Sequence, residues 1–314
     1  MKKVLFLIIA VTTLGLVSCN SNDDETGIQI EGIDLSKDVD CCSAEEALLV
    51  YKFLQTVKVV PELSTEVDKL YDVWAYTKTG KLHKGYNDIY FVVTKKKTGN
   101  YVKNYDITNV TPLMNMVKMK MWHSTPVGPA VESFDKTRLA VKRGWVSFLM
   151  NTSEAGTWQF SYDVSVLGSK GGIKEAPITV DALPAGQDWL KNFKVGDDTY
   201  FLSLVNPSDF VTGTNTIQAY ISKKSNPITT PYALASEIFT IEIDPRMPDM
   251  GSHTSPGNVA LTKQEDGSYK GSINLTMTGL WRIHLTVKDA QGSIVAGGDD
   301  LKDGFSSLYW DVTL

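Results

Sequence analysis

The segment SYKGSINLTMTGLWRIHLTV, from Ser268 to Val287, decides the class of fold. It contains two short stretches, Ser268–Met277 and Leu280–Val287, that are rich in β-branched and aromatic residues. A Thr-Gly pair separates them. Stretches of this kind, bounded by turn residues, are typical of β-strands. The segment therefore predicts two strands joined by a short turn, which we expect to form a hairpin.

The same pattern extends outward over most of the chain. It predicts further strands at Tyr71–Tyr76, Asp88–Thr94, Trp145–Leu149, Thr157–Val164, Asp198–Leu204, Thr216–Ser222 and Ala235–Ile243, and a last one at Leu308–Leu314 that closes the second sheet. Ser43-Ala44-Glu45-Glu46 has the spacing of a capping box, so a short helix is expected over Ala44–Val57. Many short strands and few helices indicate an all-β protein built of β-sandwiches.

Landmarks in the first half of this β-rich region recur in the same order in the second half. Gly-x-Asn followed by a strand and a Lys pair, His-(Ser/Thr)-(Thr/Ser)-Pro, and Met followed by Gly-x-Trp each occur twice, at Gly85 and Gly213, at His123 and His253, and at Met150 and Met277. The offsets are 128, 130 and 127 residues. The repetition predicts two tandem immunoglobulin-like sandwiches, at residues 62–180 and 181–314, with their boundary within Gly168–Gly186.

Each landmark also has a purely structural explanation. Glycine and asparagine tolerate positive φ, so each Gly-x-Asn is interpreted as a turn that starts a strand. The repeated tryptophans, Trp158 and Trp281, are expected to anchor the two cores.

The N-terminus predicts export. Met1-Lys2-Lys3 is followed by an uncharged stretch to Val17 and by Leu16-Val17-Ser18-Cys19. A charged start and a short apolar run are typical of a secretory signal, and the run is shorter than the ~20 residues that span a bilayer. The ending resembles the lipobox of bacterial lipoproteins, which implies that residues 1–18 are removed and that Cys19 carries a lipid. An ordinary secretory signal is the alternative.

Residues 19–61 are expected to form a tether and the short helical segment. The tether begins with Asn20-Ser21-Asn22-Asp23-Asp24-Glu25, which resembles the acidic export signal of some surface lipoproteins. We therefore expect a protein held by its lipid at the outer membrane, facing either the periplasm or the cell surface. A solvated linker without any sorting role would have the same composition.

Charge and cysteine content restrict the classes of function. Without the two signal lysines, 29 Lys and Arg remain against 36 Asp and Glu, which gives a net charge of −7. This balance argues against a nucleic-acid partner, because phosphate binding needs clustered basic residues. The mature chain keeps Cys41 and Cys42 as a neighbouring pair. They are interpreted as oxidised together or paired between chains, with a soft-metal pair as the alternative.

Methionine and histidine form the one pattern with chemical content. Apart from the initiator, all eight methionines lie between Met114 and Met277, and two of the four histidines, His123 and His253, occupy repeated positions. Thioether sulfur suits Cu(I), and imidazole accepts both Cu(I) and Cu(II). Met247-Pro248-Asp249-Met250-Gly251-Ser252-His253 has the composition of a loop, where a methionine has no evident core to fill. The sequence therefore predicts copper ligands at Met247, Met250 and His253.

A second, weaker copper site is predicted in the first copy, at Met121 and His123. On a strand, positions 119, 121 and 123 share one face. A half-buried strand that uses methionine to fill its core has the same pattern, so this alternative stays open.

The stretch from Met247 to His253 and on to Met277-Thr278-Gly279-Leu280-Trp281 resembles YtkA-like and FixH-like domains. These are small immunoglobulin-like sandwiches of exported or membrane-tethered bacterial proteins, and related domains are implicated in copper delivery or resistance. The resemblance covers about 100 residues of the second half and extends to the first through Met121, His123, Met150 and Trp158. The first copy departs from the pattern because it lacks the Met-x-Gly-x-Trp spacing.

We find none of the common catalytic motifs in the sequence. It contains no Gly-x-Ser-x-Gly elbow, no P-loop, no dinucleotide-binding glycine run and no His-Glu-x-x-His. We therefore expect a protein that is not an enzyme. Two hypotheses follow: a copper-binding lipoprotein, or a non-catalytic surface scaffold that binds a protein partner in the cell envelope without metal.

Overall fold

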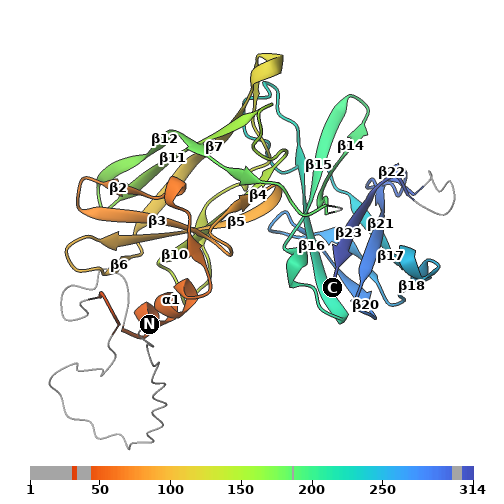
Figure 1. Cartoon of the computed structure of the whole chain (residues 1–314), viewed down its shortest axis with the longest axis horizontal. Coiled ribbons are helices and arrows are strands. Elements are labelled where there is room, and N and C mark those ends of the chain that lie inside the picture. The colour runs from red at the N-terminus through yellow and green to blue at the C-terminus, as the bar shows by residue number, and fades with distance from the viewer. Residues whose placement is uncertain (1–29, 34–43, 186, 299–305) are drawn as a thin grey trace, which may run out of the picture.

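The computed structural model describes residues 30–33, 44–185, 187–298 and 306–314. These form two lobes built of strands, with a single α-helix among the described residues (Figure 1). The predicted all-β class, with sandwich-like sheets after one short helix, is confirmed. The predicted signal segment, Cys19, Cys41 and Cys42 lie outside the described residues. Within the described part of the chain, no helix has the length and apolar character needed to cross a membrane.

The first lobe, residues 58–181, contains two facing sheets. The main path of the first sheet runs β1 (Lys58–Val59), β3 (Tyr71–Thr77), β5 (Gly85–Lys95), β10 (Val141–Phe148) and β9 (Glu132–Ser133), with β2 (Thr65–Val67) on β3 and β6 (Tyr101–Val102) on β5. The second runs β12 (Ser169–Ile178), β11 (Thr157–Val166), β7 (Tyr105–Met116) and β8 (Met121–His123). A parallel pair, β4 (Leu82–His83) and β13 (Val180–Asp181), lies beside them.

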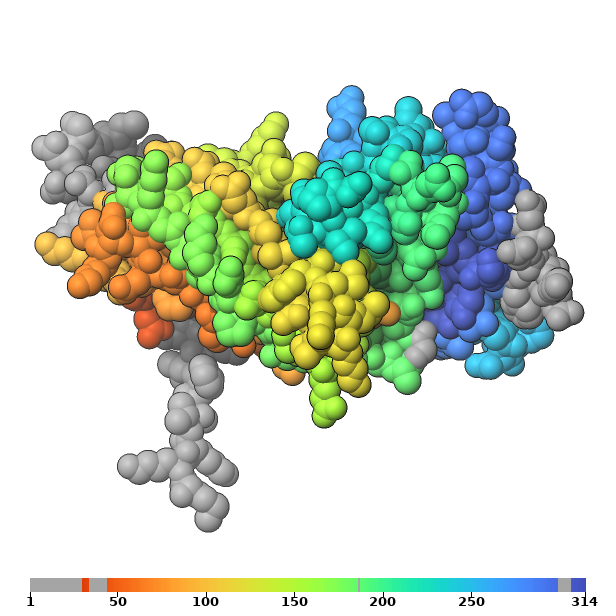
Figure 2. Space-filling model, turned by 90° about the horizontal axis from the view of Figure 1, so that it is seen from above, coloured from red at the N-terminus to blue at the C-terminus, as the bar shows by residue number. Residues whose placement is uncertain are grey.

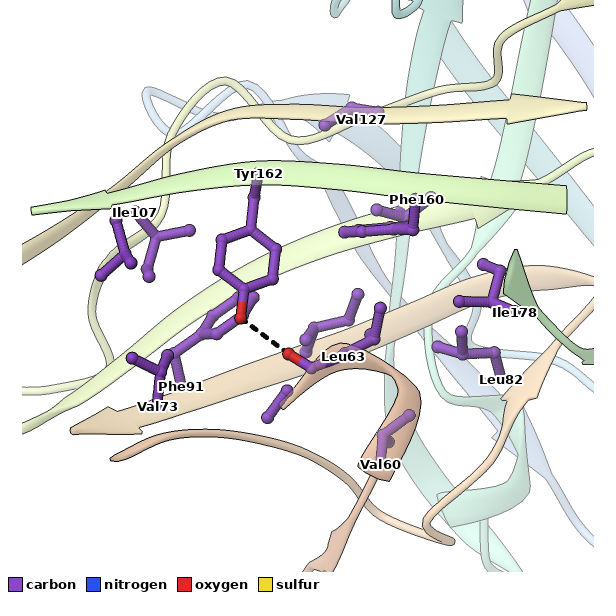
Figure 3. Close-up of a cluster of buried hydrophobic side chains, with 14 of the residues drawn as sticks. Val60, Leu63, Val73, Leu82, Phe91, Ile107, Val127, Phe160, Tyr162 and Ile178 are labelled. Atoms are coloured by element: carbon purple, nitrogen blue, oxygen red, sulfur yellow. Dashed lines mark hydrogen bonds between the residues drawn. The ribbon is translucent and has the colours of Figure 1, made fainter. Parts of the chain in front are cut away.

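The core of the first lobe lies between these two sheets. Figure 3 shows Phe160 and Tyr162 of β11 directed toward Phe91 of β5 across the interior. The buried Tyr162 hydroxyl donates a hydrogen bond of 2.7 Å to the carbonyl of Leu63, which follows β1 in the one-turn helix η1 (Pro61–Leu63). This bond satisfies two buried polar groups, which would otherwise destabilise the lobe.

The helix α1 (Ala44–Leu54) covers the outer face of the first sheet. Ala47, Val50 and Phe53 recur at spacings of three residues and are all buried, as expected for a helix that packs one apolar stripe. The ring of Phe53 meets that of Tyr90 edge-on at 5.0 Å. The predicted helix is therefore present and ends three residues earlier than expected, at Leu54.

The second lobe, residues 190–314, has its strands in one continuous path. This path is β14 (Leu190–Val195), β15 (Asp198–Leu204), β16 (Gly213–Lys223), β20 (Tyr269–Leu275), β19 (Val259–Lys263), β17 (Thr240–Met247), β21 (Leu280–Lys288) and β22 (Ile294–Gly297), with β18 (His253–Thr254) on β17 and β23 (Tyr309–Thr313) on β21. The C-terminal strand β23 therefore completes this sheet as predicted.

Strand order is the same in the two lobes along most of the path. The order β1-β3-β5-β10-β9 corresponds to β14-β15-β16-β20-β19, and β12-β11-β7-β8 corresponds to β22-β21-β17-β18. One pairing differs: β19 also pairs with β17 and so joins the two sheets of the second lobe, with Leu261 opposite Ile241. In the described part of the first lobe, β9 pairs with β10 and has no such pairing with β7.

The two Gly-x-Asn turns have the same hydrogen bonds. The amide of Asn87 donates to the carbonyls of His83 and Gly85, and the N–H of His83 donates to Asn87 Oδ1 at 2.8 Å. Asn215 makes the same three bonds with Val211 and Gly213. Gly85 and Gly213 both have positive φ, at 85° and 100°, so the interpretation of these landmarks as strand-starting turns is correct.

Two expectations about strands are wrong. The strands predicted over Ser268–Met277 and Leu280–Val287 exist as β20 and β21, but they are not hairpin partners: β20 pairs with β16 and β19, whereas β21 pairs with β17, β22 and β23. The Thr-Gly connection crosses between strands that are not neighbours. Residues 235–239 precede β17, which instead extends through Pro245 to Met247. The stretch predicted to hold the domain boundary, Gly168–Gly186, begins with β12, which pairs with β11, and residues 182–185 follow β13, the last strand of the first lobe.

Aromatic stacking fixes the lobes against one another. Trp145 of β10 stacks on Tyr220 of β16 with ring centroids 4.5 Å apart, and the hydroxyls of Ser147 and Ser203 are 2.7 Å apart in the same buried contact. Figure 2 shows the first lobe's yellow segments in contact with the second lobe's cyan segments. There the N–H of Val127 donates to the carbonyl of Tyr232 at 3.1 Å.

Candidate metal-binding hairpins

A tight hairpin connects β17 to β18 in the second lobe. Met247 ends β17, the one-turn helix η4 (Pro248–Met250) follows, and Gly251 adopts the left-handed conformation with φ of 62°. Proline suits the first position of such a turn, and glycine allows the positive φ that reverses the chain. The hairpin closes with His253 opposite Met247 in the strand pairing. Its sequence therefore explains its shape.

The three predicted ligands of this hairpin lie in different environments. Met247 is 4% exposed and packs in the core of the lobe. Met250 is 53% exposed and His253 is exposed. Opposed residues of an antiparallel pair have side chains on the same face, so Met247 and His253 share one face while Met250 lies on the turn beyond them. The expectation that Met247 has no core to fill is wrong.

Met247 is buried because Gly279, which has no side chain, leaves space for it. A β-carbon added to Gly279 would lie 2.9 Å from the terminal methyl of Met247, so the methionine occupies the space that the glycine leaves. Met114 has the same relation to Gly156 in the first lobe and is fully buried. The glycine of the repeated Gly-x-Trp pattern therefore has a packing explanation that sequence reasoning missed.

The first lobe has a corresponding hairpin between β7 and β8. The one-turn helix η2 (Val117–Met119) follows β7, and Lys120 adopts the left-handed conformation. His123 lies opposite Met114, and Met121 lies opposite Met116. Met121 and His123 share a face of β8, whereas Met119 lies in η2 and is 64% exposed. The expectation that residues 119, 121 and 123 alternate along one strand is therefore wrong for Met119.

The orientation of His123 is fixed by a backbone contact. Its Nδ1 lies 2.7 Å from the carbonyl oxygen of Ser124, which can only accept, so Nδ1 carries the hydrogen. In the neutral ring this leaves the lone pair on Nε2, and ligand histidines commonly use such a contact to fix the tautomer. The ring meets that of Trp158 edge-on at 5.6 Å. The ring of His253 lies near that of Trp281, with centroids 6.4 Å apart and the planes tilted by 55°.

Both tryptophans anchor the cores as predicted. The indole N–H of Trp158 donates to the carbonyl of Met150, and that of Trp281 donates to the carbonyl of Met277, each at 2.9 Å. Both indoles are fully buried. Met150 and Met277 are half-buried against the two cores, so their side chains act as packing.

Two further histidines lie away from these hairpins. His284 of β21 is buried, and its Nδ1 accepts a hydrogen bond of 3.2 Å from the N–H of Ser306. Burial lowers the pKa of His284 below its usual value. Burial also lowers the pKa of His83, which contacts the hydroxyl of Thr79. The described residues contain no group of three or more His, Cys, Asp and Glu side chains that could hold a metal.

Comparison with known proteins adds a family for part of the chain. Residues 194–286 match the model of the YtkA-like family, which covers most of the second lobe and less than half of the chain. No curated protein matches the chain. One similar solved structure is described as a conserved domain protein from Bacillus anthracis, at 7% identity and a TM-score of 0.30, covering 83% of this chain and 91% of that one. A similarity of that size carries no argument about function.

Proposed function

We propose that the chain is an exported, lipid-anchored protein of the cell envelope that carries copper ions on its two methionine-histidine hairpins. The family match over residues 194–286 supports this proposal, because it contains the whole hairpin from Met247 to His253. The resemblance to YtkA-like and FixH-like domains associates such hairpins with copper. Copper is the cargo in this proposal, and no reaction is assigned to the protein.

One observation carries the proposal. In each lobe a histidine lies beside a buried tryptophan at the base of a hairpin, and the one-turn helix of that hairpin ends in an exposed methionine, Met119 or Met250. An exposed methionine side chain adds no stability by packing in the core. Its presence at both turns therefore favours a role as a soft metal ligand. The preset tautomer of His123 favours coordination through Nε2.

The proposal assigns different roles to the three methionine and histidine groups of the second lobe. Met250 and His253 are the accessible ligands, because both are exposed. Met247 shares the face of His253 but is packed against Gly279, so its sulfur takes part only if the hairpin shifts. Met121 and His123 form the site of the first lobe, with Met119 at the place that Met250 takes in the second.

The proposal also includes two properties of the whole chain. Cys19 is the lipid attachment point, at the outer membrane on either its periplasmic or its outer face. The two lobes are tandem copies of one YtkA-like domain, which the shared strand order and the shared hydrogen bonds of Asn87 and Asn215 support.

The test is a Cu(I) titration of the chain from residue 20 onward against a chromophoric copper chelator. We expect Cu(I) to be retained, and the double variant Met250→Leu with His253→Ala to lose the tighter site. Met121→Leu with His123→Ala is expected to remove the weaker one. His83→Ala is the matched control, because His83 contacts Thr79 and lies in neither hairpin. Retention that is the same in all variants would contradict the proposal.

A metal-free scaffold is the second candidate function. The burial of Met247 favours it, because a methionine that fills the core needs no metal to explain its presence. The fixed contact between the lobes through Trp145 and Tyr220 also favours it, since a rigid pair of sandwiches presents its loops in a constant arrangement. Absence of Cu(I) retention in the titration would support this candidate.

A further inference from the structure

A cavity of about 470 Å³ lies at the open edge of the first lobe. One wall is the segment Asp106–Val110 of β7, and the opposite wall is Gly128–Val131, which runs beside β10. The floor consists of Ile89, Phe91, Ile107, Val127 and Val146, which are all buried core residues. Figure 3 shows Phe91 and Ile107 directed into this interior. The cavity is therefore an opening into the apolar core between two sheet edges.

Both ends of the opening are closed. At one end the ammonium of Lys142 forms an ion pair with Asp106 at 3.1 Å and donates to the carbonyl of Tyr105, which connects β10 to β7. At the other end Pro231–Leu234 of the second lobe line the cavity. Tyr232 is held there by backbone hydrogen bonds to Thr125 and Val127. A slot closed at both ends suits a compact molecule and does not suit an extended peptide that runs through it.

The second lobe closes the corresponding place with its own chain. There β19 pairs with both β20 and β17, and Leu261 is fully buried opposite Ile241. The strand registers give Val131 the place of Leu261, yet Val131 is only half-buried. Pro129 beside it has no N–H to donate to a neighbouring strand. The opening is therefore a specific difference of the first lobe and not a property of the fold.

The residues that line the cavity determine which class of ligand it can bind. The floor is apolar, and the β7 wall adds the hydroxyl of Thr108 and the carboxylate of Asp106, whereas the amide of Asn109 donates a hydrogen bond of 2.7 Å to Asp163 of β11. The volume lies within the roughly 300–1,000 Å³ of small-molecule sites, which are mostly apolar with a few polar groups that orient the ligand. The carboxylate of Asp106 is paired with Lys142, and burying a charged ligand against the apolar floor would cost free energy, so the cavity favours an uncharged ligand.

We propose that this cavity binds an uncharged, mainly apolar small molecule whose single polar group faces Thr108. The body of the ligand contacts Ile107, Val127 and Val146 in place of the strand pairing that closes the second lobe. This site is separate from both methionine-histidine hairpins, so the proposal is independent of copper.

The test uses N-phenyl-1-naphthylamine, an uncharged apolar fluorophore, with the chain from residue 20 onward. We expect saturable binding of one molecule per chain, with a fluorescence increase and a blue shift. Its anionic relative 8-anilinonaphthalene-1-sulfonate is expected to bind roughly tenfold more weakly or worse, a difference of about 1.4 kcal/mol. Absence of saturable binding, or equal binding of the two probes, would overturn the proposal.

Two variants locate the probe without cutting into the core. Ala130→Trp and Thr108→Trp each add a large side chain to an exposed position on one wall of the cavity. Each is expected to lower probe affinity at least about tenfold. Ala290→Trp is the matched control, because Ala290 is exposed on a turn of the second lobe. Unfolding midpoints check that all three variants are folded, and unchanged binding in both wall variants would place the probe elsewhere and overturn the proposal.

Discussion

The two lobes share a strand order and differ in how one edge is closed. In the second lobe β19 has five residues and pairs on both sides, whereas β9 in the first has two residues and pairs with β10. The segment before β9 reads Val127-Gly128-Pro129-Ala130-Val131, and the strand registers match it to Gly257-Asn258-Val259-Ala260-Leu261, so that Pro129 takes the place of Val259. A few residues at an edge strand therefore decide whether the same arrangement of strands is closed or holds a cavity.

The largest expected effect tests whether the lobes bury equivalent methionines. Met114→Ala and Met247→Ala are each expected to lower the free energy of unfolding by about 2–5 kcal/mol, because each removes a buried side chain packed on a glycine. Met119→Ala and Met250→Ala at the exposed turns should stay within about 0.5 kcal/mol. Denaturant unfolding measures both pairs. A costly Met250→Ala beside a neutral Met247→Ala would reverse the assignment of core and surface.

A smaller effect separates the two asparagine turns. Asn87 is 6% exposed, so Asn87→Ala leaves buried backbone groups of His83 and Gly85 without partners and should cost about 1–3 kcal/mol. Asn215 makes the same bonds where water can replace them, so Asn215→Ala should cost about 0.5–1.5 kcal/mol. Chemical unfolding of both variants checks the order. Equal losses would show that the burial of Asn87 adds nothing to the cost of losing these hydrogen bonds.

The smallest effect is a pH dependence that comes from one buried histidine of the second lobe, His284. Strand registers place His284 where the first lobe has Ser161. The pKa of His284 is lowered by burial in the folded state, so its stabilising contribution is present above the unfolded pKa of about 6.5 and is lost as pH falls below it. Because only one proton is involved, the free energy of unfolding can change by at most about 1.4 kcal/mol per pH unit from this group.

The matched variant for this test is His284→Ser, which copies the first lobe. Thermal unfolding between pH 5 and 8 should show a weaker dependence on pH in this variant than in the parent chain. An unchanged pH profile would mean that other groups cause the loss of stability in acid.

Sequence reasoning predicted most of the strands because their signals are local. The alternating and β-branched stretches at β15 and β21 begin at the predicted residues, Asp198 and Leu280, and the turns at Gly85 and Gly213 have the positive φ that Gly-x-Asn indicates. Which strands pair with one another was harder to predict from the sequence. The Thr-Gly turn before Leu280 allows either a hairpin or a crossing between distant strands, and only the packing of Leu275 and Trp281 in a common core decides between them.

The candidate site was predictable in position but not in environment. Proline, aspartate and glycine correctly indicate a turn after Met247, and Met250 and His253 are exposed on it. The burial of Met247 depends on the empty space at Gly279, which lies 32 residues later in the chain. The cavity depends on an absent pairing between β7 and the segment before β9, which no local pattern encodes.

The stack of Trp145 on Tyr220 has a consequence for how the molecule can meet others. Because the lobes are locked, the turn at η2 and the turn near β18 stay on well-separated parts of the surface, as Figure 1 shows. A partner protein that covers one of these turns leaves the other turn exposed to solvent. Binding of a partner protein at one turn is therefore independent of binding at the other. Two partners can be bound at the same time, and no hinge motion between the lobes is needed.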